Sequence, residues 1–512
     1  MNKKNWRIFY PLLLGIYPLV GLVAANIQQM VLADAIRSFV VACLFSLGMY
    51  ALFSWRIHGE HKAALLCAWF MVFFFAYGHV YNAVWGKHLF GFMIGRHRFL
   101  FPLWLAVFGV GGWLIYKKGR HLKAFSRVMN IVSIVLLVIP AVQIGSFEWQ
   151  RSRLLSGNGG NMATVQWDSA SVPAGPLPDV YYIILDQYSR DDMLLNYYNL
   201  DINGFIHQLE ETGFYVPRCS QSNYGMTLLS LPSSLNMNFV DQILPEAIRR
   251  QENEISFSGV LKHSLVRQLF EGMGYKTVSF DNGIWWSEWT DADYYITNAN
   301  GQTGMLANFR QLSDFENLFV RTTALYAVEG ATTTKWLSPF IKLVKSPEEL
   351  RYEQVSMALS GLEKVPEIPG PKFVFLHLIS PHEPYVFSPN GDFVITQATD
   401  PGYPDQIEYL NKRLAELVKV IIAKSSTPPI IILQADHGRD TEVRLANFEA
   451  YYFPQNGSSV LYPSETPVNT FRLIFNTYFG QNLPILPDIS YSSSFNDYNN
   501  FTEIKYPCDP NR

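Results

Sequence analysis

The chain has few charged residues and few cysteines for its length. Of 512 residues, 16% are charged, against about a quarter in soluble proteins. Residues 1–150 hold only three acidic side chains against 14 Lys and Arg, a net charge of +11, whereas residues 151–512 carry a net charge of −14. This asymmetry predicts two parts in different environments. The acidic second part argues against a nucleic-acid partner, which requires a basic face.

Five apolar stretches fill the first 150 residues and predict a membrane domain. They run roughly over 8–25, 36–55, 63–82, 99–116 and 128–147. Each is close to the ~20 residues that cross a bilayer as a helix. The first stretch contains Pro11 and Pro18 and lacks a small-residue cleavage pattern. We therefore expect a retained anchor rather than a secretory signal peptide.

The distribution of Lys and Arg between the predicted spans decides the orientation. Five spans place the two ends of the membrane domain on opposite sides. With the N-terminus in the cytoplasm, the inner segments carry ten Lys and Arg and the outer segments six. Because positive residues concentrate on the cytoplasmic side, we expect residues 151–512 to lie outside the cytoplasm. The prediction is a multi-pass plasma (inner) membrane protein with a cytoplasmic N-terminus and a periplasmic or extracellular second domain.

A polar segment with several glycines and prolines separates the two parts. Residues 148–178 predict a linker between a transmembrane domain, 1–147, and an external catalytic domain, 179–512. Cys43 and Cys67 fall in apolar stretches, where we expect packing residues. Cys219 and Cys508 fall in the external domain, where a disulfide can persist. The sequence leaves open whether these two cysteines are bonded.

Strand-like and helix-like patterns alternate through the external domain. Apolar runs predict strands at 180–185, 275–280, 372–377 and 429–433, and amphipathic patterns predict helices at 205–213, 260–273 and 404–424. Continuous apolar strands that alternate with helices are typical of a mostly parallel sheet covered on both faces. The predicted fold class is therefore α/β, with a five-helix transmembrane domain followed by a central sheet flanked by helices.

Polar side chains follow three of these strands. The first strand is followed by Asp186, the third leads to His382, and the fourth runs into Asp436 and His437, with Gly438 turning the chain away. Ligands of open α/β sheets bind beyond the carboxyl ends of the strands. Carboxylates and an imidazole in that place suit a divalent metal, and we expect one ion of zinc, manganese, calcium or magnesium.

A hydroxyl near a predicted helix start completes the candidate site. Residues 222–234 indicate a loop entering a short helix, with Thr227 near its start. The positive end of a helix favours an anion. A metal on the hydroxyl oxygen lowers its pKa and makes it a nucleophile, so Thr227 is both a predicted metal ligand and the predicted catalytic nucleophile. We expect His382 to hydrogen-bond the anionic substrate or to protonate the leaving group.

The order Asp, Thr, His, Asp-His-Gly resembles that of the alkaline phosphatase and sulfatase superfamily. The architecture resembles lipoteichoic acid synthases and lipid A phosphoethanolamine transferases, which also carry five membrane spans before an external catalytic domain. The resemblance rests further on Gly274-Tyr-Lys-Thr277, Pro381-His-Glu-Pro384 and Thr227-Leu-Leu-Ser-Leu-Pro232. It implies an alkaline-phosphatase-like domain in which Asp186, Asp436 and His437 bind metal, Thr227 is the covalent nucleophile, and His382 binds substrate or donates a proton.

Three departures from the family patterns narrow the expected reaction. The transferases carry Glu where this chain has Asp186, but Asp is usual in sulfatases and phosphatases, so the ligand role survives. Formylglycine-type sulfatases need Cys or Ser followed by Pro-Ser-Arg or a close variant, whereas Thr227 precedes Leu-Leu-Ser and Cys219 precedes Ser-Gln-Ser. Two-metal phosphatases need further ligands, but the external domain holds only His207, His263, His377, His382 and His437. We therefore expect one tightly held metal.

Together these features predict a membrane-anchored, metal-dependent phosphotransferase or phosphodiesterase. Anchoring at the membrane favours a membrane lipid as partner and a lipid-linked or envelope-glycan phosphoester as substrate, cleaved or transferred through Thr227. The first alternative is a sulfuric-ester or phosphomonoester hydrolase. The second is a non-catalytic membrane scaffold or sensor that retains the fold.

Each candidate residue also has a purely structural alternative. The Asp-His pair can form a simple strand-end turn, and His382 can be a loop residue between prolines. Thr227 can be a helix N-cap, in which case Ser222 or Ser230 is the substitute nucleophile. We expect His377, which lies inside an apolar strand, to be a core histidine rather than a ligand.

Overall fold

Contacts between residues divide the chain into two units. Unit 1 comprises Met1–Gln150 and Gly304–Ser346, and unit 2 comprises Arg151–Thr303 and Pro347–Arg512. The computed structural model describes residues 8–27, 30, 32–89, 92–93, 95–118, 122–157, 167–173, 175–244, 254–297, 314–327, 346–395, 402–439, 443–494, 497–506 and 508–509. A segment from the second half of the chain therefore returns to the unit formed by the first 150 residues.

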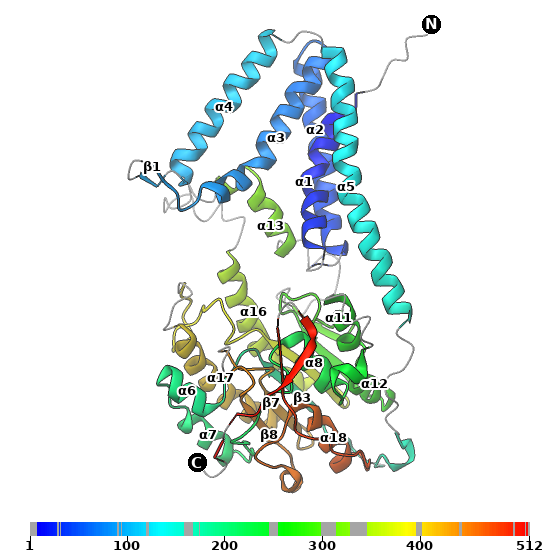
Figure 1. Cartoon of the computed structure of the whole chain (residues 1–512), viewed down its shortest axis with the longest axis vertical. Coiled ribbons are helices and arrows are strands. Elements are labelled where there is room, and N and C mark those ends of the chain that lie inside the picture. The colour runs from blue at the N-terminus through cyan, green and yellow to red at the C-terminus, as the bar shows by residue number, and fades with distance from the viewer. Residues whose placement is uncertain are drawn as a thin grey trace. The chain divides into compact units, whose positions relative to one another are not determined.

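Apolar helices make up most of unit 1 (Figure 1). Among the described residues, four helices are long and apolar enough to cross a membrane: α2 (Ile36–Arg56), α3 (Glu60–Val84), α4 (His97–Lys118) and α5 (Leu122–Gly157). The fifth apolar helix, α1 (Tyr10–Asn26), is shorter, with 17 residues. The prediction of five full-length spans is thus confirmed for four. The apolar run of α1 ends at Asn26, whose side-chain amide donates to the carbonyl oxygen of Leu22.

A helix from the returning segment packs in unit 1. This helix, α13 (Asp314–Thr322), contacts α3, where Phe319 stacks on Phe75 with ring centroids 5.7 Å apart. Arg37 of α2 forms an ion pair with the buried carboxylate of Glu316. The backbone after Phe319 approaches Gly78 so closely that a Cβ at this position would clash with it, so the approach requires glycine. The small elements of unit 1 are η1 (Leu32–Ala35), β1 (His88–Leu89) and β2 (Phe92–Met93).

A six-stranded sheet forms the centre of unit 2. Its strand order is β5-β4-β6-β3-β7-β8, and all neighbours are parallel except β7 and β8. The strands are β3 (Val180–Leu185), β4 (Lys276–Phe280), β5 (Tyr294–Ile296), β6 (Lys372–Leu378), β7 (Ile430–Gln434) and β8 (Glu449–Tyr452). The predicted α/β class with a mostly parallel sheet is confirmed, and the four predicted strands are present to within one residue at each end.

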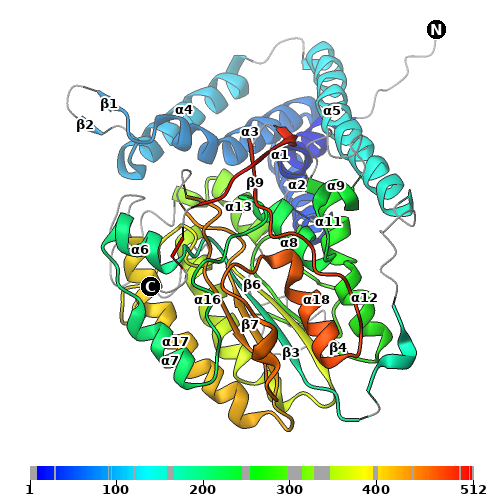
Figure 2. The same cartoon turned by 60° about the horizontal axis from the view of Figure 1, so that its bottom comes forward.

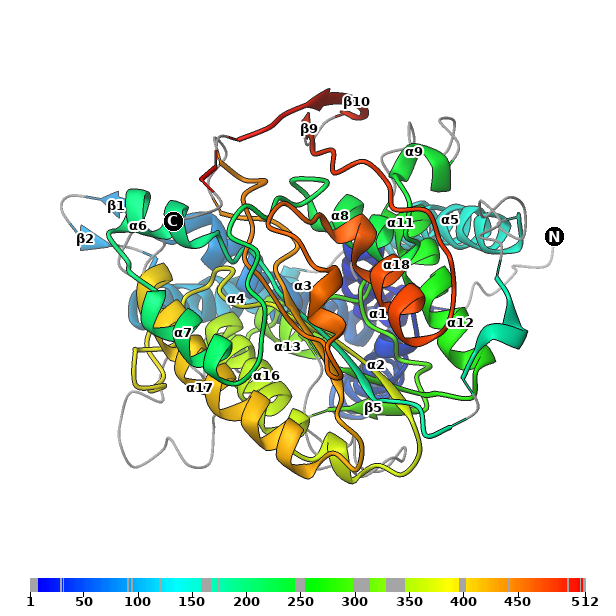
Figure 3. The same ribbon diagram turned by 90° about the horizontal axis from the view of Figure 1, so that it is seen from below.

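Helices cover both faces of this sheet (Figures 2 and 3). Side chains alternate along β3, so that Tyr181 and Ile183 join one core and Tyr182 and Ile184 join the other. The first core is closed by α7 (Asn203–Glu211), α16 (Pro347–Leu362) and α17 (Gly402–Lys424). The second is closed by α8 (Thr227–Leu235), α12 (Leu265–Gly272) and α18 (Pro467–Tyr478). Burial of both faces is why the strands are apolar throughout.

The remaining elements of unit 2 are short. They are η2 (Ser169–Ser171), α6 (Asp191–Tyr198), α9 (Val240–Ile243), α11 (Glu254–Lys262), η4 (Val365–Glu367), η5 (Gly457–Val460), β9 (Tyr491–Ser494) and β10 (Asp497–Glu503). The single helix predicted at 260–273 is wrong, because Ser264 adopts an extended N-cap conformation that separates α11 from α12. Within the predicted linker, α5 continues to Gly157, and residues 158–166 and 174 lie outside the described residues.

A disulfide joins Cys219 to Cys508 and connects the loop before α8 to the end of the chain. The two sulfur atoms come from positions 289 residues apart. Cys43 and Cys67 in unit 1 are free thiols. Cys219 and Cys508, whose bonding the sequence leaves open, are thus joined by a disulfide in unit 2.

Candidate active site

Two neighbouring strands of the sheet place two carboxylates side by side. β3 and β7 are parallel neighbours, with Ile184 opposite Gln434. Asp186 and Asp436 each lie two residues beyond that pair, at the carboxyl edge of the sheet. Both are buried, with exposed fractions of 3% and 0%. The strand register therefore brings together two residues that lie far apart in the sequence.

The turn after β7 fixes the orientation of Asp436 and His437. Asp436 Oδ1 accepts hydrogen bonds from the backbone N–H groups of Gln187 at 3.1 Å and His437 at 2.9 Å. His437 Nδ1 donates to the carbonyl oxygen of Gly438 at 2.8 Å, which makes Nε2 the nitrogen that carries the lone pair. A Cβ on Gly438 would lie 2.8 Å from the carbonyl oxygen of Ala446, so this turn requires glycine.

Asp186, Asp436 and His437 form a buried group suited to a metal ion. One ligand atom from each residue lies within 4.8 Å of the others. Asp186 Oδ1 is buried without a hydrogen-bond partner among the residues that the structure describes. A buried carboxylate oxygen in that state costs free energy unless a cation compensates it. Carboxylate oxygen and imidazole nitrogen are accepted by zinc and manganese, so the residues fit the expected divalent metal.

The local electrostatics keep these ligands in their metal-binding protonation states. Burial acts to raise the pKa of Asp186, but the charges of His382, His377 and His437 and the close contact with the His377 ring outweigh it and hold this pKa well below its usual value. Burial lowers the pKa of His437, and the opposing influence of Asp436 does not cancel it. Near neutral pH, Asp186 is therefore ionised and His437 neutral, as metal ligands must be.

Thr227 lies beside this group as the first residue of α8. Met226 is the N-cap and has an extended backbone, so Thr227 is inside the helix rather than its cap. The Thr227 hydroxyl donates to Asp436 Oδ2 at 2.6 Å, and its oxygen lies 3.4 Å from His437 Nε2. Thr227 is half-buried, whereas Asp436 and His437 are buried. The hydroxyl is therefore the member of the group that a substrate can approach.

Two serines join the end of β7 to α8. Ser230 Oγ donates to the backbone carbonyl oxygen of Asp436 at 2.7 Å, and Ser222 Oγ donates to the same oxygen. Both serine side chains are buried. Their hydroxyl protons are engaged with the backbone, so the arrangement favours a positioning role for Ser222 and Ser230 and leaves Thr227 as the candidate nucleophile.

A second layer of polar side chains supports Asp186. His377 on β6 lies opposite Ile184, and its Nε2 is 3.4 Å from Asp186 Oδ2. Its Nδ1 is 3.0 Å from Ser287 Oγ and 3.4 Å from Asn282 Nδ2. His377 is buried as predicted, but its contact with Asp186 could not be predicted, because it depends on the register of β3 and β6.

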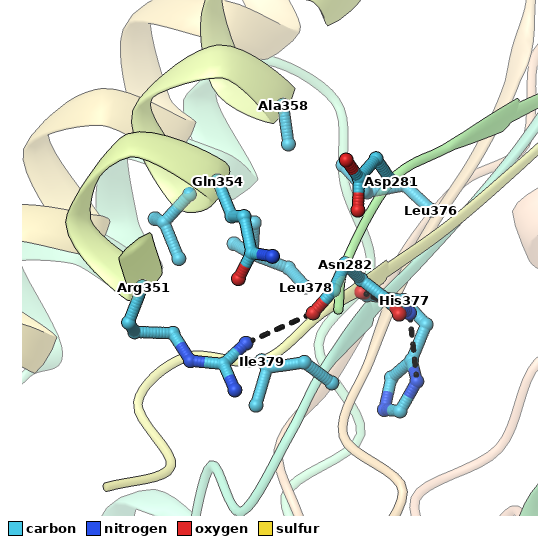
Figure 4. Close-up of a pocket in the computed structure, with 10 residues that line it drawn as sticks. Asp281, Asn282, Arg351, Gln354, Ala358, Leu376, His377, Leu378 and Ile379 are labelled. Atoms are coloured by element: carbon cyan, nitrogen blue, oxygen red, sulfur yellow. Dashed lines mark hydrogen bonds between the residues drawn. The ribbon is translucent and has the colours of Figure 1, made fainter. Parts of the chain in front are cut away.

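Behind His377 lies a small pocket. Figure 4 shows it between the end of β4, the end of β6 and α16, with Arg351 donating to the backbone carbonyl oxygen of Asn282 at 3.1 Å. Neither Thr227 nor the three candidate metal ligands line it. The pocket is thus separate from the candidate active site.

His382 lies in the loop after β6 and is half-buried. Its Nδ1 is 2.7 Å from the carbonyl oxygen of Glu383, and its own carbonyl oxygen accepts from Gln406. A positive charge on the His382 ring lowers the pKa of Asp186. Within the described residues, its side chain forms no hydrogen bond with Asp186 or Thr227. His382 thus lies near the Asp186, Asp436 and His437 group, but no described hydrogen bond links its side chain to Asp186 or Thr227.

Two arginines that the sequence did not single out lie next to the site. Arg444 Nη2 is 3.2 Å from His437 Nε2, and Arg439 packs on the rings of Tyr198, Tyr385 and Tyr403. The only signal in the sequence is that both follow the Asp-His-Gly turn within a few residues. Their place depends on the path of residues 443–446, which returns to the turn, where the backbone carbonyl oxygen of Arg444 accepts a hydrogen bond from the N–H of Gly438.

No protein-family model and no curated protein matches the chain. Several solved structures resemble it. The C-terminal periplasmic domain of EcEptC from Escherichia coli is 13% identical, with a TM-score of 0.39 over 66% of this chain and 95% of that one. The integral membrane phosphoethanolamine transferase EptA from Neisseria meningitidis is 12% identical, with a TM-score of 0.37 over 92% and 94%.

The lipoteichoic acid synthase LtaP from Listeria monocytogenes is 11% identical, with a TM-score of 0.35 over 63% of this chain and 77% of that one. EptA and LtaP bear the names of the two kinds of enzyme that the sequence motifs resemble. At such low identities and TM-scores the similarity does not identify the reaction, which has to come from the residues of the site.

Proposed function

We propose that this chain is a membrane-anchored, metal-dependent phosphotransferase or phosphodiesterase of the alkaline phosphatase and sulfatase superfamily. The observation that carries the proposal is the 2.6 Å hydrogen bond from the Thr227 hydroxyl to Asp436 Oδ2, at the N-terminus of α8 and beside a buried Asp/Asp/His group. One divalent ion of zinc, manganese, calcium or magnesium, held by Asp186, Asp436, His437 and Thr227, would lower the pKa of the hydroxyl and offset the charge of the substrate.

In the first step, Thr227 Oγ1 attacks the phosphorus atom of the phosphoester. The new P–O bond forms as the bond to the leaving oxygen breaks, and the threonine proton, which Asp436 Oδ2 accepts as a hydrogen bond in the free site, passes to water. His382 protonates the leaving oxygen. The positive end of α8 favours the negative charge that collects on the phosphoryl oxygens. The product is a phosphothreonine and a free alcohol.

The second step returns Thr227 to its starting state. Water or an acceptor hydroxyl attacks the phosphothreonine and gives its proton to His382. The bond from phosphorus to Thr227 Oγ1 breaks, and water returns a proton to that oxygen. Water as the acceptor makes the chain a hydrolase, whereas an alcohol on a lipid or glycan makes it a transferase.

Three features support a substrate at the outer face of a membrane. Four long apolar helices and the shorter α1 belong to the same chain. At ~1.5 Å per residue, the 17 residues of α1 span about 25 Å, the lower end of what a crossing needs. The disulfide between Cys219 and Cys508 requires an oxidising compartment. We therefore place the N-terminus in the cytoplasm, unit 2 in the periplasm or outside the cell, and the phosphoester on a lipid or envelope glycan.

The proposal is tested on the full chain in detergent micelles. We would measure bound metal by elemental analysis and turnover of aryl phosphodiester, phosphomonoester and sulfate esters, for the wild type, Thr227→Ala and Thr227→Ser. The expected result is about one metal ion per chain and diester cleavage that falls on the order of 10³-fold or more in Thr227→Ala. Thr227→Ser, which keeps a hydroxyl, should retain part of the turnover.

A matched control is Thr212→Ala, which removes a hydroxyl that, among the described residues, bonds the backbone carbonyl oxygen of Gln208. This variant should behave as the wild type. Full activity of Thr227→Ala contradicts the assignment of the nucleophile. Sulfate-ester or monoester turnover without diester cleavage favours a hydrolase of those esters, and a folded chain without metal or turnover favours a non-catalytic scaffold or sensor.

A further inference from the structure

Arg444 follows the Asp-His-Gly turn and comes back to the candidate site. Its Nη2 lies 3.2 Å from His437 Nε2, and its Nε donates to the carbonyl oxygen of Gly225, in the loop that leads to Thr227. Its aliphatic stem packs against Gly225, where a Cβ would lie 3.4 Å from Arg444 Cδ. The guanidinium is therefore placed between the histidine of the metal group and the segment that carries the nucleophile.

The contact between Arg444 and His437 involves the atom that a metal ion needs. His437 Nδ1 donates to Gly438, so its lone pair is on Nε2, and Arg444 Nη2 is placed to donate to that lone pair. A metal ion on His437 takes the same lone pair. Arg444 Nη2 must then turn to another acceptor, while the bond from Arg444 Nε to Gly225 keeps the guanidinium close to Thr227.

A phosphoester that reacts with Thr227 supplies such an acceptor. Guanidinium groups present planar N–H donors that match the oxygens of a phosphate group, and they remain charged at any working pH. Arg444 is half-buried, so its contact with a phosphoryl oxygen would be only partly screened by water.

We propose that Arg444 binds a non-bridging oxygen of the phosphoryl group that Thr227 attacks, and that it leaves His437 when metal and substrate bind. This rests on the proposed function. Because phosphate draws Arg444 away from His437, phosphate and metal each strengthen the binding of the other. Arg444 is thus a substrate-binding residue that opposes metal binding when no phosphate is present.

The test uses the full chain in detergent micelles, stripped of metal. We would titrate Zn²⁺ with and without inorganic phosphate into the wild type, Arg444→Gln and Arg444→Lys, and measure kcat/KM for an aryl phosphodiester. In the wild type, phosphate should raise zinc affinity at least ~5-fold. Arg444→Gln should bind zinc at least as tightly as the wild type, lose the effect of phosphate, and lose about 10²-fold in kcat/KM.

Arg413→Gln is the matched control, since Arg413 on α17 pairs with Glu363 and Glu416 instead. It should match the wild type in zinc affinity, phosphate effect and turnover. Arg444→Lys keeps the charge but not the planar donors, and it should recover only part of the turnover.

Two results overturn the proposal while leaving the proposed function intact. Weaker zinc binding in both Arg444 variants assigns Arg444 a merely structural role, because removing a competitor for His437 Nε2 cannot weaken the binding of zinc. Unchanged turnover and an unchanged phosphate effect in Arg444→Gln show that the side chain does not touch the phosphoryl group. If the wild type itself neither binds zinc nor cleaves the diester, the proposed function fails, and the role of Arg444 fails with it.

Discussion

Each candidate ligand has one polar atom fixed by the protein and another turned toward the site. Asp436 Oδ1 accepts two backbone N–H groups while Oδ2 accepts from Thr227. His437 Nδ1 is bonded to the backbone while Nε2 faces the group. Asp186 Oδ2 lies near His377 while Oδ1 has no partner among the described residues. Such outer contacts orient a metal ligand before the ion arrives.

A buried glutamate near the carboxyl edge of the sheet makes the stability of the protein depend on pH. Glu449 on β8 lies 3.0 Å from Asn447 Nδ2 and 2.7 Å from the Tyr451 hydroxyl. Burial raises the pKa of Glu449 to about 8, against 4.5 in the unfolded chain. Between these values the folded protein holds a proton that the unfolded chain has lost, so the free energy of unfolding falls as pH rises.

Glu449→Gln, which keeps the shape but cannot ionise, should weaken this pH dependence. We expect the slope of the free energy of unfolding to change by up to about 1.4 kcal/mol per pH unit between roughly pH 5 and 8. Denaturant unfolding at pH 5, 6.5 and 8 measures it. Glu416→Gln, at a side chain that is 69% exposed, is the control. An unchanged slope in Glu449→Gln would mean that Glu449 titrates alike in both states.

At the scale of elements, the site depends on how α8 is joined to the end of β7. The joint is made by Ser230, whose hydroxyl bonds the carbonyl oxygen of Asp436. Ser233 on the same helix is equally buried, but its hydroxyl bonds the carbonyl oxygen of Asn238, away from the site. Variants of the two serines therefore distinguish an effect on the stability of α8 from an effect on the position of Asp436.

Ser230→Ala and Ser233→Ala should lose similar stability but differ in turnover. Each removes one buried hydrogen bond, which costs about 1–3 kcal/mol. Only Ser230→Ala also removes one of the two serine hydroxyls that hold the backbone carbonyl oxygen of Asp436, and we expect it to lower turnover about tenfold or more. Thermal unfolding and diester cleavage of both variants are the measurements. Equal turnover in the two variants would contradict the role of Ser230.

The elements that sequence predicts well here are the apolar ones. β3, β6 and β7 are buried on both faces, so their apolar runs are unbroken. β5 and β8 were missed because they have three and four residues, and β8 begins with Glu449. Residues at strand ends were predictable from the parallel topology. The contacts of His377 and Arg444 were not, because one depends on strand register and the other on a loop that folds back.

At the scale of the molecule, residues 304–346 distinguish this chain from a simple anchor followed by a domain. They belong to unit 1, although β4 precedes them and β6 follows them in unit 2. The hydropathy of residues 304–346 does not indicate that they belong to unit 1. The segment is held by Phe319 on Phe75 and by the ion pair of Arg37 with Glu316.

A single cut between α5 and β3 should therefore not release the second fragment from the membrane. We would replace residues 158–163 with a protease site, cleave the full chain in membrane vesicles, and separate pellet from supernatant. The fragment that begins after the cut should stay in the pellet, because α13 packs on α3. The double variant Glu316→Ala, Phe319→Ala should shift it to the supernatant. Release of the wild-type fragment by cleavage alone would contradict this.

The return of α13 to α3 also sets an order on synthesis. The chain leaves the ribosome from its N-terminus, so the face of α3 around Phe75 and Gly78 waits uncovered until α13 has been made. At that moment β3 still lacks both of its neighbours, β6 and β7, which lie further along the chain. The packing of the membrane helices can thus be completed while the sheet that carries the candidate site is still unfinished. A translation arrest after α13 but before β6 would leave unit 1 folded and the sheet of unit 2 incomplete.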